Sequence, residues 1–318
     1  MWAGAHVRPI PASTPQLRRE ARWLRENAAA FKQLLEDGST TGVTSCMGIE
    51  YLDDPPIEYQ NQTTQSFTAE TGLSGYRQLS ASEMPEGVKL GFEYQTYCVN
   101  SPLYCGDLLR KFITRGGKTL DRDLRSAWEG FTLRPKVLFV VNATGTGFGD
   151  LKTFPTRGQT VVTNLTSATK TVTRQNKDGT WSFIIPRFFN GGTVIGGTKD
   201  LGSWQSEPSL ATRERLLQGG KELAPYSRDG PNAPIADDAP IGVITDVVGR
   251  RPTREGGMRI EIEERQFTGL DGQLKNGPVV HAYGAGGRGF EIGWGVAREV
   301  AAMAAPLIPS PKKTSSKL

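Results

Sequence analysis

The stretch HAYGAGGRGFEIGWGVAR, residues 281–298, decides how the rest of the chain is interpreted. Gly284, Gly286 and Gly289 fit the spacing G-x-G-x-x-G of a loop that holds the phosphates of a dinucleotide. A strand is predicted before this loop (PVVHAYG) and a helix after it. A dinucleotide site also needs a second parallel strand with an acid about 20 residues on, but only a short tail follows Ala305. Three interpretations remain: a phosphate loop, a turn that packs a C-terminal helix, or a loop against a cofactor ring.

Composition places the chain among globular proteins. Of its 318 residues, 37% are hydrophobic and 22% are charged, which suits one large domain or two ordinary ones. The net charge of +5 does not indicate nucleic-acid binding, because Lys and Arg are spread along the chain. No apolar run approaches the ~18 residues of a membrane span, and the first residues lack the apolar core of a signal peptide.

Cysteine and histidine are scarce. The chain has three cysteines without a C-x-x-C pair, and two histidines. This set cannot assemble a zinc site, so no metal is expected. Reduced thiols in an intracellular protein are the simplest account of the cysteines.

Hydrophobic periodicity predicts helices and strands in a mixed arrangement. Ser13, Thr14 and Pro15 begin a helix that Gly38 ends. Residues 134–145 (RPKVLFVVNATG) predict a buried strand. The other predicted elements are helices at 101–115 and 209–226 and strands at 88–97, 158–165, 169–175, 181–188, 191–199, 240–252 and 258–266. Helix–strand units around a block of short antiparallel strands predict α/β plus α+β architecture.

Six ordered segments carry a resemblance to a known family. HAYGAGGRGFEIGWG resembles the C-terminal signature of the D-amino-acid oxidase family, which includes D-aspartate oxidases. The other five are WAGAHVRP (2–9), VVNATG (140–145), PTRGQT (155–160), IIPRFFNGGTVIGGT (184–198) and GRRPTREGG (249–257). The resemblance implies an FAD enzyme that oxidises a D-amino acid to an imino acid. Oxygen is then reduced to hydrogen peroxide, and the imino acid hydrolyses to a 2-oxo acid and ammonia.

The resemblance also implies a domain division. An FAD-binding parallel-sheet domain is expected from residues 1–45, 98–157 and 240–306, and an antiparallel-sheet substrate domain from 46–97 and 158–239. Residues 307–318 are expected to be a flexible tail. The family's first βαβ unit, with its own G-x-G-x-x-G loop, is expected before WAGAH and is missing here. The alternative to an active oxidase is therefore an FAD-free, inactive relative that acts as a peroxisomal binding protein.

The substrate site follows from matched positions. Arg251 matches the family's carboxylate-binding arginine, and a guanidinium fork suits a carboxylate. Phe183 stands where the family usually has Tyr, so the ring is kept and a hydrogen bond is lost. Lys199 and His6 are expected to favour a second, side-chain carboxylate, as in D-aspartate. Gly287 is expected to lie close to the substrate.

The cofactor site also follows from matched positions. The residues expected to bind FAD are Gly4, Ala5, His6, Leu124, Asn142, Gly145, Gly286, Gly287, Arg288, Gly289 and Glu291, with Arg157 as a weaker candidate. Glu291 departs from the family's neutral hydrogen-bonder, and its charge needs a partner such as Arg288. The resemblance implies that the substrate's α-hydrogen leaves as hydride, so no acid–base residue is expected.

The C-terminus SSKL carries a possible address. A terminal Ser-Lys-Leu is read by the peroxisomal import receptor, and peroxide production suits that compartment. The expected partners are the D-amino acid, O2 and this receptor, with a possible homodimer and without nucleic acid or membrane.

Overall fold

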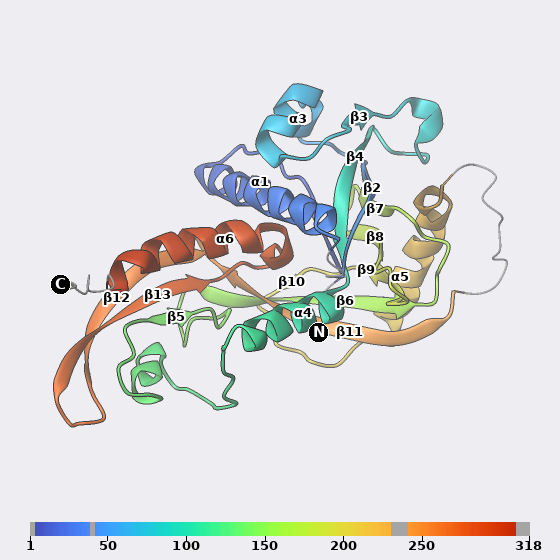
Figure 1. Ribbon diagram of the computed structural model, residues 1–318. Coiled ribbons are helices and arrows are strands. Elements are labelled where there is room, and N and C mark those ends of the chain that lie inside the picture. The colour runs from blue at the N-terminus through green and yellow to red at the C-terminus, as the bar shows by residue number, and fades with distance from the viewer. Residues whose placement is uncertain (1–3, 39–41, 230–240, 310–318) are drawn as a thin grey trace. The chain divides into compact units, whose positions relative to one another are not determined.

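The chain forms two compact units in a computed structural model that describes residues 4–38, 42–229 and 241–309 (Figure 1). The first unit contains residues 1–119, 155–251 and 287–295. The second contains residues 120–154, 252–286 and 296–318. The two units are described separately below.

The first unit is built on a ten-stranded mixed sheet. Its main order is β1 (Ala5–His6), β4 (Leu90–Val99), β2 (Val43–Leu52), β7 (Thr171–Gln175), β8 (Trp181–Pro186), β9 (Thr193–Gly196), β6 (Thr153–Thr163) and β10 (Asp200–Leu201). In addition, β11 (Val243–Arg254) pairs with β6, and β3 (Arg77–Gln78) pairs with β4. β2 and β7 are parallel, whereas β7, β8, β9 and β6 pair antiparallel in that order. The predicted antiparallel block is confirmed.

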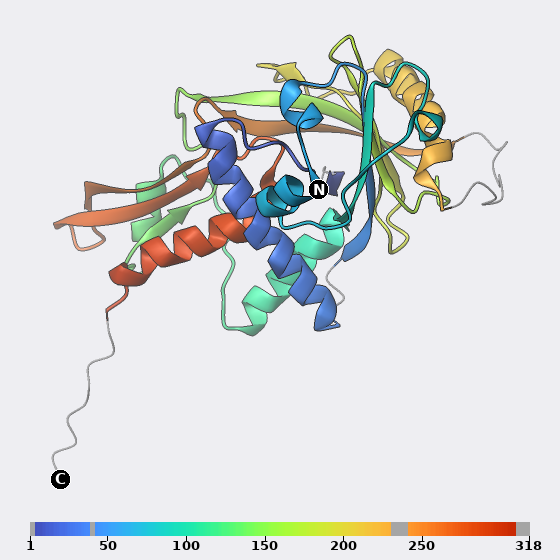
Figure 2. The same ribbon diagram turned by 90° about the horizontal axis from the view of Figure 1, so that it is seen from above.

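Helices pack around this sheet. They are α1 (Pro15–Glu36), α2 (Ile57–Gln60), α3 (Thr64–Thr71), α4 (Ser101–Thr114) and α5 (Leu210–Leu223), followed by the start of α6 (Gly289–Ala304). The Thr14 side chain caps α1 as predicted, since its hydroxyl accepts a hydrogen bond from the backbone of Leu17. α1 lies beside α3 (Figure 2), where Arg25 donates to the carbonyls of Ala69 and Glu70. The 3-10 turns η1 (Ala81–Glu83) and η3 (Ala224–Ser227) complete the unit.

The second unit is a three-stranded sheet in the order β12 (Arg259–Thr268), β13 (Leu274–Tyr283) and β5 (Val140–Asn142). β12 and β13 form a long antiparallel hairpin, and β5 pairs parallel with β13. The turn η2 (Ala127–Thr132) packs Ala127 and Phe131 against Val279 in a small core. The last residues of α6 and the turn η4 (Ala305–Leu307) also belong to this unit. The predicted α/β plus α+β architecture is confirmed.

One predicted strand is shorter and more exposed than expected. Residues 134–145 were predicted to form a buried strand, but only Val140–Asn142 pair, and Leu138 and Val141 are 48% and 43% exposed. β5 lies at the edge of its sheet, pairing only with β13 among the described residues. An apolar run therefore did not identify burial here, because an edge strand lacks a neighbour on one side.

The compact units do not coincide with the predicted domain boundaries. The predicted boundary at residue 45/46 falls inside β2, which pairs with β4 along its whole length. Residues 1–45 and 46–97 therefore share the first unit. The assignment of segments to cofactor and substrate binding stays a prediction.

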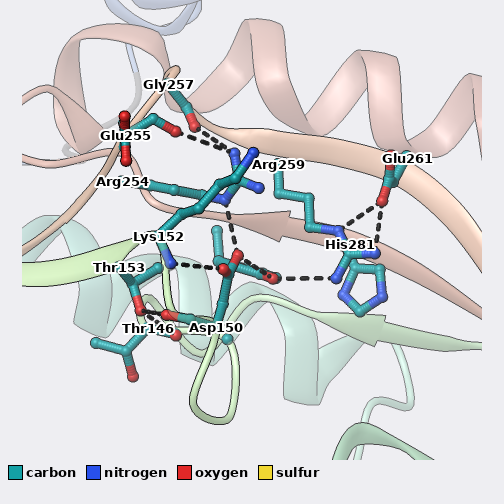
Figure 3. A network of polar contacts seen from close by, with 12 residues as sticks. Thr146, Asp150, Lys152, Thr153, Arg254, Glu255, Gly257, Arg259, Glu261 and His281 are labelled. Atoms are coloured by element: carbon teal, nitrogen blue, oxygen red, sulfur yellow. Dashed lines mark hydrogen bonds and ion pairs between the residues drawn. The ribbon is translucent and has the colours of Figure 1, made fainter.

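A polar network stabilises the second unit (Figure 3). Asp150 accepts hydrogen bonds from Arg254 Nε at 2.8 Å, from the Tyr283 hydroxyl at 2.9 Å and from the backbone N–H of Lys152 at 2.9 Å. Partial burial raises the pKa of Asp150, but these hydrogen bonds outweigh it and lower the pKa to about 2. The carboxylate therefore contributes stability above the unfolded-state pKa of roughly 3.9, and this contribution is lost as pH falls towards about 2.

We expect Asp150→Asn to lower the free energy of unfolding by about 2 kcal/mol near neutral pH, because hydrogen bonds to a charged group are lost. Urea denaturation at neutral pH and at about pH 3 measures this. The difference in the free energy of unfolding between wild type and variant should shrink at the lower pH, where the wild-type carboxylate begins to protonate. A difference that is the same at both pH values contradicts a role for the Asp150 charge.

Candidate active site on the main sheet

The two faces of the main sheet differ in character. One face packs against α5 through an apolar core that includes Ile49, Tyr51, Val172, Ile184, Ile195 and Leu216. The other face carries a cross-strand row in which paired residues present their side chains to the same side. This row consists of Glu50, Thr173, Phe183, Gly196 and Thr160. We call this second face the site face.

Arg251 lies over the site face among glycines. A Cβ on Gly158 would be about 2.2 Å from Arg251 Nη1, so the guanidinium occupies the space that a side chain would fill. A Cβ on Gly287 would be 3.4 Å from Arg251 Cδ. Arg251 Nη1 donates to the Thr198 carbonyl at 3.1 Å. The sequence-predicted residues Arg251 and Gly287 are thus brought together.

The guanidinium of Arg251 has no carboxylate partner among the described residues. Burial lowers its pKa below the usual value, and the charge of Asp200 offsets part of this. Arginine nevertheless stays protonated in proteins. Arg251 is partly buried, and a cation withdrawn from water without an ion pair is costly unless an anion joins it. This arrangement suits the binding of a carboxylate.

Phe183 lies on the site face, on strand β8. Its ring lies against the backbone of two glycines, since a Cβ on Gly196 would be 2.2 Å and one on Gly197 2.7 Å from ring carbons. The ring is half-buried on the site face and packs against the apolar cluster of Val194 and Ile185. Phe183 thus contributes an apolar ring to the site face, and its role in substrate binding stays a prediction.

The loop of the opening stretch leads into a helix, as predicted. α6 begins at Gly289, where a Cβ would have no neighbour within 4 Å. Arg288 makes ion pairs with Glu291 at 2.8 Å and with Glu20 at 2.5 Å. The charge of Glu291 is therefore compensated by Arg288, as expected, and Glu20 of α1 is a third member that sequence analysis missed.

His6 belongs to a buried ionic cluster at the end of the site face. Its Nε2 lies 3.9 Å from Glu50 Oε1, and Arg8 Nε lies 3.4 Å from Glu50 Oε2. The Tyr94 hydroxyl donates to Glu50 at 3.3 Å. The Arg8 guanidinium stacks over the Trp181 ring at 4.1 Å. Glu50 is 1% exposed, so this cluster is removed from solvent.

The other predicted site residues have varied surroundings. Lys199 is exposed, and Arg157 is fully engaged with Asp200 and the carbonyls of Gln205 and Glu207. A Cβ on Gly4 would meet Val194 at 2.7 Å, and Ala5 is buried in β1. Four predicted cofactor residues belong to the second unit: Leu124, Asn142, Gly145 and Gly286. There Asn142 contacts His281 Nδ1 at 3.1 Å, and the Gly145 carbonyl accepts the N–H of Gly284.

Sequence analysis missed Arg8, Glu50, Trp181 and Gly158. β2, which carries Glu50, lies in the region 42–75 that gave a mixed pattern. Its alternation was a usable signal, because Ile49 and Tyr51 point to the core and Glu50 to the opposite face. Arg8 is two residues from His6 in the matched WAGAHVRP segment.

Neither a membrane span nor a metal cluster is found in the part of the chain that the structure describes. No helix there is long and apolar enough to cross a bilayer. No group of three or more His, Cys, Asp or Glu side chains there is placed to hold a metal ion.

Solved structures define the class of fold. The chain resembles a glycine oxidase from Geobacillus kaustophilus, with a TM-score of 0.64, 17% identity, and coverage of 97% of this chain and 85% of that one. It also resembles L-alpha-glycerophosphate oxidase from Mycoplasma pneumoniae with FAD bound, with a TM-score of 0.66, 12% identity, and coverage of 96% and 84%. The architecture is that of these oxidases.

Sequence comparison then gives the family. Residues 2–303 match the family of FAD-dependent oxidoreductases, and the chain belongs to it. A D-aspartate oxidase from Talaromyces thermophilus is 43% identical over 308 residues, which cover 95% of this chain and 77% of that protein. A D-amino-acid oxidase from Schizosaccharomyces pombe is 26% identical over 314 residues, covering 96% and 84%. The predicted family and FAD cofactor are confirmed.

The residues of the site face fit a polar, planar cofactor ring. Several buried side-chain atoms on or beside this face lack a hydrogen-bond partner among the described residues, including His6 Nε2, Arg8 Nε, Glu50 Oε2, Thr160 Oγ1 and Thr173 Oγ1. The start of α6 offers backbone N–H groups and a positive helix terminus next to open space at Gly289. Gly287, Gly289 and the site face would hold the ring portion of FAD.

Proposed function

We propose that the protein oxidises a D-amino acid to the imino acid while O2 is reduced to hydrogen peroxide, after which the imino acid hydrolyses to a 2-oxo acid and ammonia. The single observation that carries this proposal is the partly buried Arg251 guanidinium, which has no ion pair among the described residues and lies against Gly158 beside the loop of Gly287. The sequence relatives named D-aspartate oxidase and D-amino-acid oxidase support it.

The residues of this chain bind and orient the substrate. Arg251 pairs with the α-carboxylate through two parallel N–H···O bonds, which fixes the α-carbon. Phe183 excludes water from one side of the pocket and strengthens this pairing by lowering the local dielectric constant. When bound, FAD supplies the group that takes up two electrons from the substrate and passes them to oxygen. The N-terminus of α6 stabilises negative charge in this region.

We further propose a preference for an acidic D-amino acid such as D-aspartate. The relative with 43% identity is named D-aspartate oxidase. The exposed position of Lys199 does not support its predicted role, whereas the buried cluster with His6 lies on the site face. Arg8 of this cluster is a second cation on that face, and it favours a second carboxylate.

Purification with excess FAD tests the activity. We expect a yellow protein with flavin absorbance that produces peroxide from D-aspartate, measured with a peroxidase-coupled assay, and not from L-aspartate. Peroxide from D-alanine at a much higher rate than from D-aspartate contradicts the acidic preference. A flavin-loaded protein that oxidises none of a panel of D-amino acids contradicts the proposed function.

We also propose import into peroxisomes through Ser316-Lys317-Leu318, which lie outside the described residues. The import receptor is then a partner, and a homodimer stays a prediction. A fluorescent fusion at the N-terminus should colocalise with a peroxisomal marker. Deleting the last three residues should disperse the signal, and unchanged colocalisation contradicts the address.

A further inference from the structure

We propose that Arg8 binds the side-chain carboxylate of a dicarboxylic D-amino acid, with Glu50 as the residue that positions it. This inference rests on the proposed function and adds a specificity residue to it. The Arg8 guanidinium stacks over the Trp181 ring, and Glu50 Oε2 lies 3.4 Å from Arg8 Nε. Arg8 was not among the sequence-predicted residues.

Arg8 and Arg251 lie over one row of the sheet. Trp181 and Phe183 are two residues apart on β8, so both side chains are on the site face. Gly158 and Thr160 are likewise two residues apart on β6, so both are on the site face. Gly197 donates to the Trp181 carbonyl, and Thr198 donates to the Gln159 carbonyl, so the segment after β9 joins the two strands. Arg8 over Trp181 and Arg251 over Gly158 are thus two strands apart on one face.

This separation suits a short dicarboxylate. Strands about 4.8 Å apart place Trp181 and Gly158 on the order of 10 Å from each other. The carboxyl groups of a four- or five-carbon chain are roughly 4–5 Å apart, and each charge-assisted hydrogen bond adds about 2.8 Å. A substrate of this length reaches both guanidinium groups, whereas an alanine-sized substrate reaches only Arg251.

The electrostatics of the cluster keep Arg8 charged and fixed. Burial lowers the pKa of Arg8, but Glu50, Tyr59 and Glu291 raise it above the usual value for arginine. Glu50 faces Nε, and Tyr59 hydrogen-bonds the same side chain, but a guanidinium with five N–H donors can still bind a further carboxylate. Glu50 also accepts from Tyr94, so its own orientation is set by the sheet. Glu50 thus acts through Arg8 and does not need to touch the substrate.

The test removes the charge pair without leaving a lone buried charge. In Arg8→Met with Glu50→Gln, the apolar stem over Trp181 and the acceptor for Tyr94 are retained. We expect the ratio of kcat/KM for D-aspartate to that for D-alanine to fall roughly 10- to 100-fold, mainly through KM. The matched control Arg115→Met, which removes an exposed charge directly after the end of α4, should keep the wild-type ratio.

A second variant and a binding measurement separate this inference from the proposed function. Glu50→Gln alone should raise KM for D-aspartate and leave KM for D-alanine close to that of wild type, because Arg8 loses the carboxylate that holds it in place. Succinate should raise the Tm of the FAD-loaded protein more than butyrate does, and the double variant should lose this difference. An unchanged substrate ratio in the double variant, or equal effects of succinate and butyrate on wild type, overturns the role of Arg8. A wild type that prefers succinate but oxidises no D-amino acid sinks only the proposed function.

Discussion

Arg251→Leu should reduce kcat/KM for every D-amino acid by about 10²- to 10³-fold, because losing one partner of a buried charge pair costs roughly 2–5 kcal/mol. The loss should be shared by acidic and neutral substrates, since each carries the α-carboxylate that Arg251 binds. At the same time the Tm of the substrate-free protein should stay the same or rise. The variant removes a partly buried charge that has no carboxylate partner among the described residues.

Arg250, which precedes Arg251 in the sequence, offers a matched control. Arg250 is exposed, donates to the Trp204 carbonyl at 3.3 Å and lies over the Trp204 ring. Arg250→Leu should therefore leave kcat/KM within about 3-fold of wild type, as for surface substitutions in general. Steady-state kinetics and thermal unfolding of both variants measure these effects. Equal losses in the two variants, or a fall in the Tm of Arg251→Leu, contradict a ligand role for Arg251.

The sequence was sufficient for much of the fold. The capped helix at Pro15–Glu36, the antiparallel block and the helix after the GAGGRG loop follow from local signals that the structure confirms. The extent of β5 did not follow, because an apolar run does not show whether a strand has neighbours on both sides. Side-chain burial at a sheet edge depends on other segments of the chain, which a local pattern cannot report.

The candidate site was predicted only in part, because a local sequence pattern does not report which segments lie beside each other in the sheet. Arg251 and Gly287 were found from matched motifs, and the structure brings them together. Glu50 was not found, because a single acid in a strand is distinguished only by the residues paired with it across the sheet. Lys199 illustrates the converse: a position next to a matched motif can still be exposed. Motifs located the segments, whereas the register of the sheet decides which side chains share a face.

Gly158→Ala should disable the site without changing any charge. A Cβ at this position would lie 2.2–2.4 Å from the guanidinium atoms of Arg251, so the guanidinium must move away from the sheet. A misplacement on the order of 1 Å can cost about 10²-fold in rate. We therefore expect kcat/KM to fall roughly 10- to 100-fold. The FAD content should stay close to that of wild type, as judged from the ratio of flavin to protein absorbance.

The backbone itself should tolerate this alanine. Gly158 lies within β6 and lacks the positive φ that requires glycine, so the expected effect comes from the side chain of Arg251. Gly106→Ala is the matched control, because a Cβ there would meet nothing within 4 Å. Combining Gly158→Ala with Arg251→Leu should add little to the loss caused by Arg251→Leu alone, since both act on one contact. Full additivity in this double-mutant cycle means that Gly158 acts independently of Arg251, and the geometry derived for the carboxylate site is then wrong.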